Sequence, residues 1–148
     1  MKIETLIAMN RFGVGGNQGD ADSIGSDPRD WIKSQIRGQQ STPAAFSNFR
    51  SSEEIFTEVN RARLESRETL RTLMRNLYKT DFARECMVRA GHMVRAKDPF
   101  AERMGLFWSN HFTVSRSKWI VGPIIPAYER EVIRPNIFGK FSEMLASV

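Results

Sequence analysis

Apolar residues recur at helical spacing through the middle of the chain. From Ser51 to Lys97 there is no proline, and the single glycine is Gly91. Small or apolar side chains recur there every three or four residues, at Ile55, Val59, Ala62, Ser66, Leu70, Leu73 and Leu77. This spacing places them on one helix face. The stripe loses phase near Thr80 and resumes at Phe82, Cys86, Ala90 and Met93 or Val94, so the pattern predicts a long kinked central helix or two helices.

Three sequence signals mark helix starts. Asp27-Pro28 and Asp98-Pro99 each combine an N-cap acceptor with proline at the first helical position. Ser51 and Glu54 have the spacing of a capping box. The helix after Asp98 is the most clearly marked, because Phe100, Met104, Phe107 and His111 share a face.

Three shorter helices complete the predicted set. Residues 2–12 form one, with Ile3, Leu6 and Ile7 directed inward. A second runs from Tyr128 to Arg134 and is halted by Pro135, since proline interrupts helical hydrogen bonding. The last follows Gly139 and ends at Val148 without a cap. This bare end predicts that the chain is cut short.

No segment alternates strictly between apolar and polar residues, so no strand is predicted. We therefore expect an all-α fold, a multi-helix array with one long central helix. The 148 residues suit a single helical region, 1–148. Because of the uncapped end, we expect this region to be the N-terminal part of a larger helical domain.

Composition supports a globular chain. The residues are 41% hydrophobic and 26% charged, and the net charge is +5. The apolar run from Leu6 to Met9 is too short for a signal-peptide core or a membrane span. The sequence therefore predicts a soluble protein, and a cytoplasmic one as far as the missing signal indicates.

Part of the positive charge is organised in a basic row with a spacing of four residues: Arg63, Arg67, Arg71, Arg75 and Lys79. Like charges at this spacing destabilise an isolated helix by about 0.2–0.5 kcal/mol per pair. One interpretation is that Glu65, Glu68 and neighbouring helices neutralise the row. The other is an anionic partner, either nucleic acid, lipid or acidic protein. No aromatic residues interleave the row, which argues against a platform for single-stranded nucleic acid.

His111 is the residue most suited to be a ligand or a base. It could work with Asn110, Glu131 and Arg134 in a hydrolase-like site, or with Glu102, Glu129 or Glu131 in a metal-assisted one. We expect instead that His111 is buried at the end of an aromatic helix face, with one ring nitrogen hydrogen-bonded to a backbone carbonyl. His92 and Cys86 are the remaining histidine and cysteine, and no metal or nucleophile motif is present, so no metal and no cofactor are predicted.

A second charged cluster consists of Glu129, Arg130, Glu131 and Arg134. Their spacing of one helical turn is typical of a salt-bridge network. We expect this network to attach the helix that begins at Tyr128 to the long central helix.

Three motifs in order resemble the bacterial family catalogued as domain of unknown function 1800. They are Asn10-Arg11-Phe12-Gly13-Val14-Gly15, then Glu102-Arg103 with Phe107 to Ser115, then Tyr128 to Pro135 with Gly139-Lys140-Phe141. The resemblance spans nearly the whole chain. It implies a helical protein several times longer, in which a motif containing His-Pro follows soon after the last helix.

The resemblance does not imply a mechanism, because the family has no established activity. Family members often carry histidine where this chain has Ser109 and Asn136, which weakens any site built on a histidine cluster. The leading hypothesis is therefore an interaction or structural module, part of a larger protein, that works through protein partners or its own missing C-terminal part. The alternatives are an enzyme with a site around His111, completed by residues beyond this chain, and a nucleic-acid or other anionic-partner binder that uses the basic row.

Overall fold

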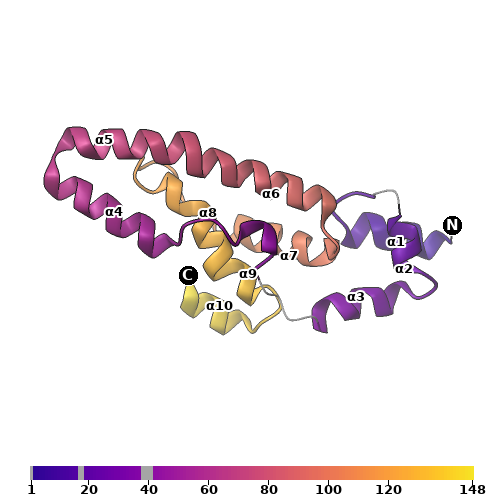
Figure 1. The fold of residues 1–148 in the computed structure, drawn as a ribbon. Helices are drawn as coiled ribbons and strands as arrows, with labels where there is room; N and C mark the ends of the chain where they lie inside the picture. The colour runs from indigo at the N-terminus through magenta and orange to yellow at the C-terminus, as the bar shows by residue number, and fades with distance from the viewer. Residues whose placement is uncertain (1, 17–18, 38–41) are drawn as a thin grey trace.

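The computed structural model describes residues 2–16, 19–37 and 42–148, and every regular element among them is helical. Three groups of helices lie along the molecule (Figure 1). One end is formed by α1 (Ile3–Phe12), α2 (Asp20–Ile24) and α3 (Pro28–Arg37). The upper layer is formed by α4 (Ser52–Glu65), α5 (Arg67–Asn76), η2 (Leu77–Phe82) and α6 (Ala83–Arg95).

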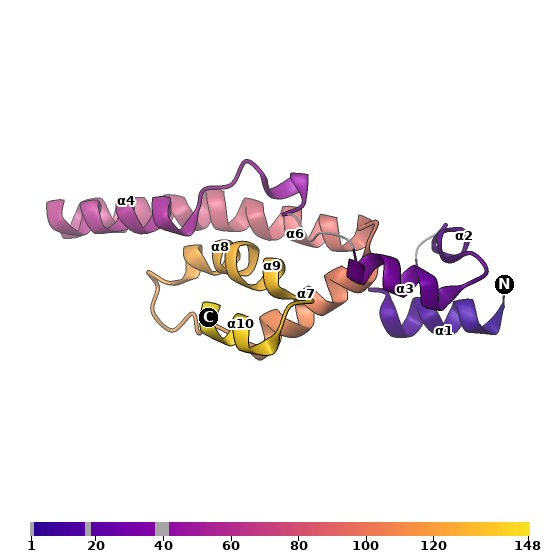
Figure 2. The ribbon, with the colours of Figure 1, turned by 90° about the horizontal axis from the view of Figure 1, so that it is seen from below.

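The lower layer contains the rest of the chain, as the rotated view shows (Figure 2). It begins with α7 (Pro99–His111) and continues through the short turn η3 (Gly122–Ile124). Next come α8 (Ile125–Tyr128), η4 (Glu129–Ile133) and α9 (Arg134–Asn136), which follow one another without a break, and then α10 (Phe141–Ser147). The all-α prediction is confirmed.

The long helix is present, but it begins later than the periodicity predicted. Ser66 is extended, with φ −165° and ψ 160°, so α4 ends there and the chain reverses into α5. The Ser66 hydroxyl accepts a hydrogen bond from the Thr69 amide and caps α5. The apolar stripe continues across the break because the two antiparallel helices face each other. The continuous helix is formed by α5, η2 and α6.

The loss of phase near Thr80 corresponds to η2, a π-helical segment in the middle of this long helix. A π-helix makes i→i+5 hydrogen bonds, so it adds residues to a turn and shifts the following stripe around the axis.

The lower layer has a matching π-helical segment, η4. There the Arg134 amide donates to the Glu129 carbonyl, five residues back, and the helix continues through Pro135 to Asn136. The predicted helix from Tyr128 to Arg134 therefore begins three residues earlier, at Ile125, and ends two residues later, at Asn136.

Two apolar clusters hold the helices together. The first joins α4, α5 and η2 through the buried side chains of Ile55, Val59, Met74 and Leu77. Ile124 of η3 packs against this cluster, and Gly122 allows the close approach, because a Cβ there would lie 2.0 Å from the Tyr78 hydroxyl. The second cluster lies within the lower layer and joins α7 to η4 and to the end of α9 through Ala101, Ile133 and Ile137.

Two of the three predicted N-caps are present. Ser51 and Glu54 form the capping box at the start of α4. The Asp27 carboxylate accepts from the Arg29 and Asp30 amides at 3.0 and 3.1 Å. Asp98 precedes α7 without a side-chain cap, although Pro99 occupies the first turn as expected. Instead, the Gln35 side chain of α3 accepts a hydrogen bond from the Phe100 amide.

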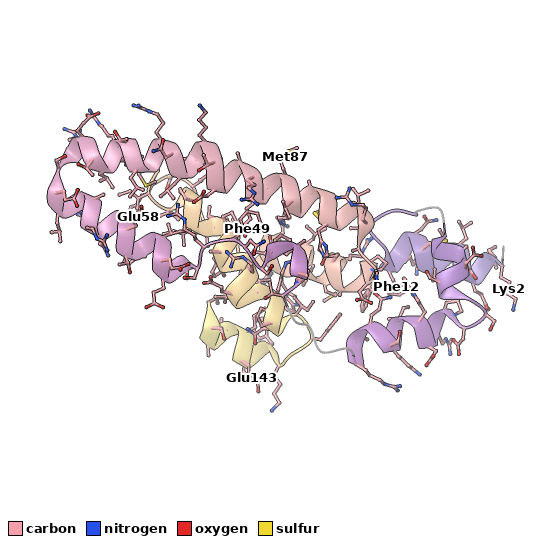
Figure 3. The ribbon with its side chains drawn as sticks, in the orientation of Figure 1. Lys2, Phe12, Phe49, Glu58, Met87 and Glu143 are labelled. Atoms are coloured by element: carbon pink, nitrogen blue, oxygen red, sulfur yellow. The ribbon has the colours of Figure 1, made fainter. Side chains whose placement is uncertain are left out.

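The inward face of α1 was predicted wrongly. Thr5 and Ala8 are buried, whereas Ile3, Leu6 and Ile7 are exposed. Phe12 lies at the junction between α1 and α7, where its ring meets the edge of Phe100 (Figure 3). No helix among the described residues has the length and apolar character needed to cross a membrane.

Candidate functional site

The face that α6 turns toward the lower layer is polar. Glu85 is buried, and Arg89 and His92 are partly buried, whereas Cys86, Met87 and Ala90 are exposed. Figure 3 shows Met87 on the outer side of the long helix. The predicted stripe through Cys86 and Ala90 therefore faces outward, because η2 rotates α6 relative to α5.

The polar face of α6 binds the lower layer through a charge ladder. Its members are the ion-paired residues Glu85, Arg89, His92, Glu102, Glu129, Arg130 and Arg134. Arg130 donates to Glu85 at 3.0 Å, and Arg89 donates to both carboxylate oxygens of Glu129 at 2.8–2.9 Å. The predicted attachment of the Glu129–Arg134 cluster to the long helix is thus present. Three arginines face three glutamates, so the ladder is balanced before His92 is counted.

The end of the ladder nearest α3 is a connected site of three residues. Arg134 donates to both oxygens of Glu102, at 2.6 and 2.9 Å, and also to Glu129 at 3.3 Å. The His92 Nε2 lies 3.1 Å from the Glu102 Oε1. The Phe46 ring covers this site, with the Arg134 guanidinium 5.1 Å from its centroid and the His92 ring edge-on at 5.4 Å.

The local charges determine the ionisation of the two buried glutamates. Burial acts to raise the pKa of Glu102, but the hydrogen bonds and charge of Arg134, together with His92, outweigh burial and lower this pKa below its usual 4.5. The balance is opposite at Glu85, where burial outweighs Arg130 and raises the pKa of the carboxyl. Glu102 is therefore held as an anion, which accepts two bonds from Arg134 and one from His92.

The Arg134–Glu102–His92 site forms one wall of a cavity of about 510 Å³. The cavity lies between the second half of α3, the segment around Ala44, the end of α6 and the start of α7. The sequence predicted Arg134 as a candidate site residue. It indicated Glu102 only as a possible metal ligand beside His111, and it assigned no role to His92. A usable signal was present, because Glu85, Arg89 and His92 recur at i, i+4 and i+7 and match the charges of residues 129–134.

His111 is exposed, which corrects the expected burial. It is the last residue of α7, and its ring contacts Phe107, Trp108 and Phe112. The Trp108 indole, one turn before Phe112, donates to the Ile137 carbonyl at 3.1 Å. The aromatic face therefore points partly to solvent, because Trp108 takes the inward position that His111 was expected to hold.

The four candidate catalytic residues are not gathered in one site. His111 and Asn110 are exposed at the C-terminal end of α7. Arg134 is buried against Glu102, nine residues before His111, a separation of roughly 13 Å along a helix. Glu131 is exposed and accepts hydrogen bonds from the Ser52 amide at 3.0 and 3.3 Å. Within the described ranges, no hydrogen bond or ion pair joins His111 or Asn110 to Arg134 or Glu131.

The basic row is divided by the turn at Ser66. Arg63 belongs to α4, whereas Arg67, Arg71, Arg75 and Lys79 continue along α5 and η2. All five side chains are exposed. In the part of the chain that the structure describes, none of them forms a salt bridge with a carboxylate, and this includes Glu65 and Glu68. The described residues also contain no cluster of three histidine, cysteine or acidic side chains suited to a metal ion.

These features define the class of protein: a two-layered helical protein whose long central helix is joined to the lower layer by a charge ladder. The model of the family described as "Protein of unknown function (DUF1800)" matches residues 7–148, and the chain belongs to this family. Neither the curated proteins nor the solved structures contain a match to the chain.

Proposed function

We propose that this protein is an interaction module that binds an acidic segment of a partner protein through an aromatic surface. This surface is formed by five rings that contact one another: Phe107, Trp108, His111, Phe112 and Phe141. Phe107, His111 and Phe141 are exposed, whereas Trp108 and Phe112 are partly buried beneath them, and the exposure of the first three rings is the observation that carries the proposal. Phe107 and Phe141 are 54% and 53% exposed.

The surface continues along α10. Leu145 lies one turn after Phe141 and is 55% exposed, whereas Met144 is buried and fixes the helix against the rest of the protein. Isolated exposed apolar residues are ordinary, but a contiguous group on two fixed helices is typical of a binding surface. Aromatic side chains are also enriched among the residues that dominate binding energy at interfaces.

Charge favours an acidic segment as the occupant. The chain carries +5, so two copies repel each other, whereas an acidic segment is attracted. Lys140 and Glu143 at the start of α10 form an exposed pair. An amphipathic segment with apolar anchors and acidic flanks complements this surface.

The test uses a labelled peptide with leucine and tryptophan at helical spacing and glutamate at the other positions. We expect it to bind the wild-type protein in fluorescence anisotropy and to bind F107A/F141A at least tenfold more weakly. Phe56→Ala provides the matched control, since Phe56 is 55% exposed on α4, away from these rings. Circular dichroism checks that each variant is folded.

Several outcomes would overturn the proposal. One is equal binding of a peptide in which lysine replaces glutamate, because the partner would then not be selected by charge. A second is dimerisation in sedimentation equilibrium that F107A/F141A abolishes, because the occupant would then be a second copy. A third is salt-sensitive binding of duplex DNA that is lost in R67A/R71A/R75A while the peptide fails to bind, which would support the basic row as a nucleic-acid site.

A further inference from the structure

The cavity beside the Arg134–Glu102–His92 site has a lining of mixed chemistry. Its ionisable residues are His92, Arg95, Lys97, Asp98, Glu102 and Arg134. Its small apolar residues are Pro43, Ala44, Ala45, Ala96, Ala101 and Ile137, and Ser34 and Gln35 complete the lining. The volume of about 510 Å³ lies within the range of pockets that hold small molecules.

The ionisable residues of the lining have a cationic excess. Arg95, Lys97 and Arg134 contribute three positive charges, and Asp98 and Glu102 contribute two negative ones, which leaves +1 before His92 is counted. Glu102 is not available to a ligand, because both of its oxygens already accept from Arg134. The side chains of Arg95 and Lys97 are exposed, and neither forms a salt bridge within the described residues.

The position of Arg95 depends on Gly91. A Cβ at Gly91 would lie 2.6 Å from the Arg95 Nη2, so the bare glycine backbone makes room for the guanidinium to fold back along α6. This arrangement keeps the guanidinium along the helix that carries His92, and Arg95 is one of the residues that line the cavity.

The orientation of His92 follows from Glu102. A carboxylate only accepts hydrogen bonds, so Nε2 of His92 carries the proton that points to Glu102. The opposite nitrogen, Nδ1, makes no hydrogen bond with the described residues. When the ring is doubly protonated, Nδ1 becomes a third donor for an anion beside Arg95 and Lys97.

We propose that this cavity binds a small aliphatic acid. Its anionic oxygens lie among Arg95, Lys97 and Nδ1 of His92, and its hydrocarbon body lies against the alanines, Pro43 and Ile137. Arg134 and Glu102 position His92 and close the floor of the site. This site is separate from the aromatic surface, which lies at the other end of α7.

The test is an NMR titration of the ¹⁵N-labelled protein with hexanoate, hexyl phosphate and 1-hexanol. We expect both acids to shift the amide signals of residues 91–98 saturably, and the uncharged alcohol to bind at least tenfold more weakly. A preference between the two acids distinguishes a carboxylate from a phosphate ligand. Equal binding of the alcohol, or no saturable shift with either acid, would overturn the proposal.

Matched variants separate the site from general electrostatics. R95A/K97A and R63A/R67A each remove two exposed positive charges, but only the first pair lines the cavity. Hexanoate affinity should fall at least tenfold in R95A/K97A and less than twofold in R63A/R67A. An equal loss in the two variants would show attraction to the net charge alone and would overturn the proposed site.

Two further variants test the other contacts. His92→Gln retains an N–H donor for Glu102 but cannot become doubly protonated, so hexanoate should bind it about threefold or more weakly. Ala45→Phe places a large side chain at an exposed position of the cavity lining and should block hexanoate. Unchanged affinity in both variants would place the acid elsewhere, whereas F107A/F141A should leave hexanoate affinity unchanged.

Discussion

The two ends of the long helix are attached to the protein by different chemistry. The α5 end packs through side chains that are almost completely buried, such as Met74 and Leu77, against α4 and η3. The α6 end is attached through the charge ladder, in which Glu85 and Glu102 are as buried as ordinary core residues. An apolar contact is indifferent to small changes in direction, whereas an ion pair needs a particular geometry. The polar end is therefore the one suited to positioning a functional site.

Breaking the polar end should have the largest effect. Glu102→Ala leaves Arg134 buried without its principal partner, which we expect to lower the free energy of unfolding by about 3–5 kcal/mol. Urea denaturation followed by circular dichroism measures this loss. The double variant Glu102→Met with Arg134→Met should recover most of it, because an apolar pair of similar volume carries no unpaired charge. If the double variant is no more stable than E102A, the ladder supplies net stability and not only geometry.

Breaking the apolar end should cost slightly less. Leu77 is 1% exposed, so Leu77→Ala leaves a cavity at the centre of the first cluster. We expect a loss of about 2–4 kcal/mol in the same urea experiment. Leu64→Ala is the control, since Leu64 is 88% exposed and its truncation should change stability by less than about 0.5 kcal/mol. Equal effects at the two leucines would contradict the packing described for this end.

The two ends also differ in how well the sequence predicts them. The apolar end follows from periodicity, which correctly places Ile55, Val59 and Leu77 inward. It places Ser66 on the apolar stripe although Ser66 caps α5, and it omits Met74, which is completely buried. The Ser66-x-x-Thr69 spacing with Glu68 in the first turn was the local signal for a helix start.

The polar end could not be derived from hydrophobic pattern. Charged residues are expected at the surface, so hydrophobicity gave no sign that Glu85 is buried; the only signal was the spacing of Glu85, Arg89 and His92, which matches the charges of residues 129–134. The cluster of Glu129, Arg130 and Arg134 did predict attachment to the long helix, because opposite charges one helical turn apart can be recognised in the sequence. The direction in which η2 rotates α6 was not predictable from periodicity. As a result Glu85 faces inward, where the periodicity had placed Cys86.

Acid should weaken the polar end selectively through Glu102. Its pKa is lowered in the folded protein, so the unfolded chain takes up more protons as the pH falls through the ordinary value of 4.5. The stabilisation is present above that value and is lost as the pH falls toward the folded pKa. The Glu85 carboxyl, whose pKa is raised, acts in the opposite direction and favours the folded state as it is protonated.

Urea midpoints at neutral pH and at a pH below 4.5 check this difference. The decrease on acidification should be smaller in Glu102→Gln than in the wild-type protein and larger in Glu85→Gln. The apolar variant Leu77→Ala should retain the wild-type dependence on pH, because it removes no titratable group. A decrease that is identical in all four proteins would show that the buried glutamates do not set the acid response.

The smallest expected effect concerns the start of α4, which lies between the first apolar cluster and the charge ladder. Ser51 caps α4, and the next residue, Ser52, donates its amide to Glu131 beside the ladder. Ser66 provides a comparison, since it caps α5 in the same way far from the ladder. Ser51→Ala and Ser66→Ala should each cost about 1 kcal/mol in urea denaturation. Equal costs are expected because Glu131 binds Ser52 and not Ser51. A cost for Ser51→Ala that exceeds the cost for Ser66→Ala by more than about 1 kcal/mol would mean that the cap and the ladder are coupled, so that the polar end also determines where the apolar end begins.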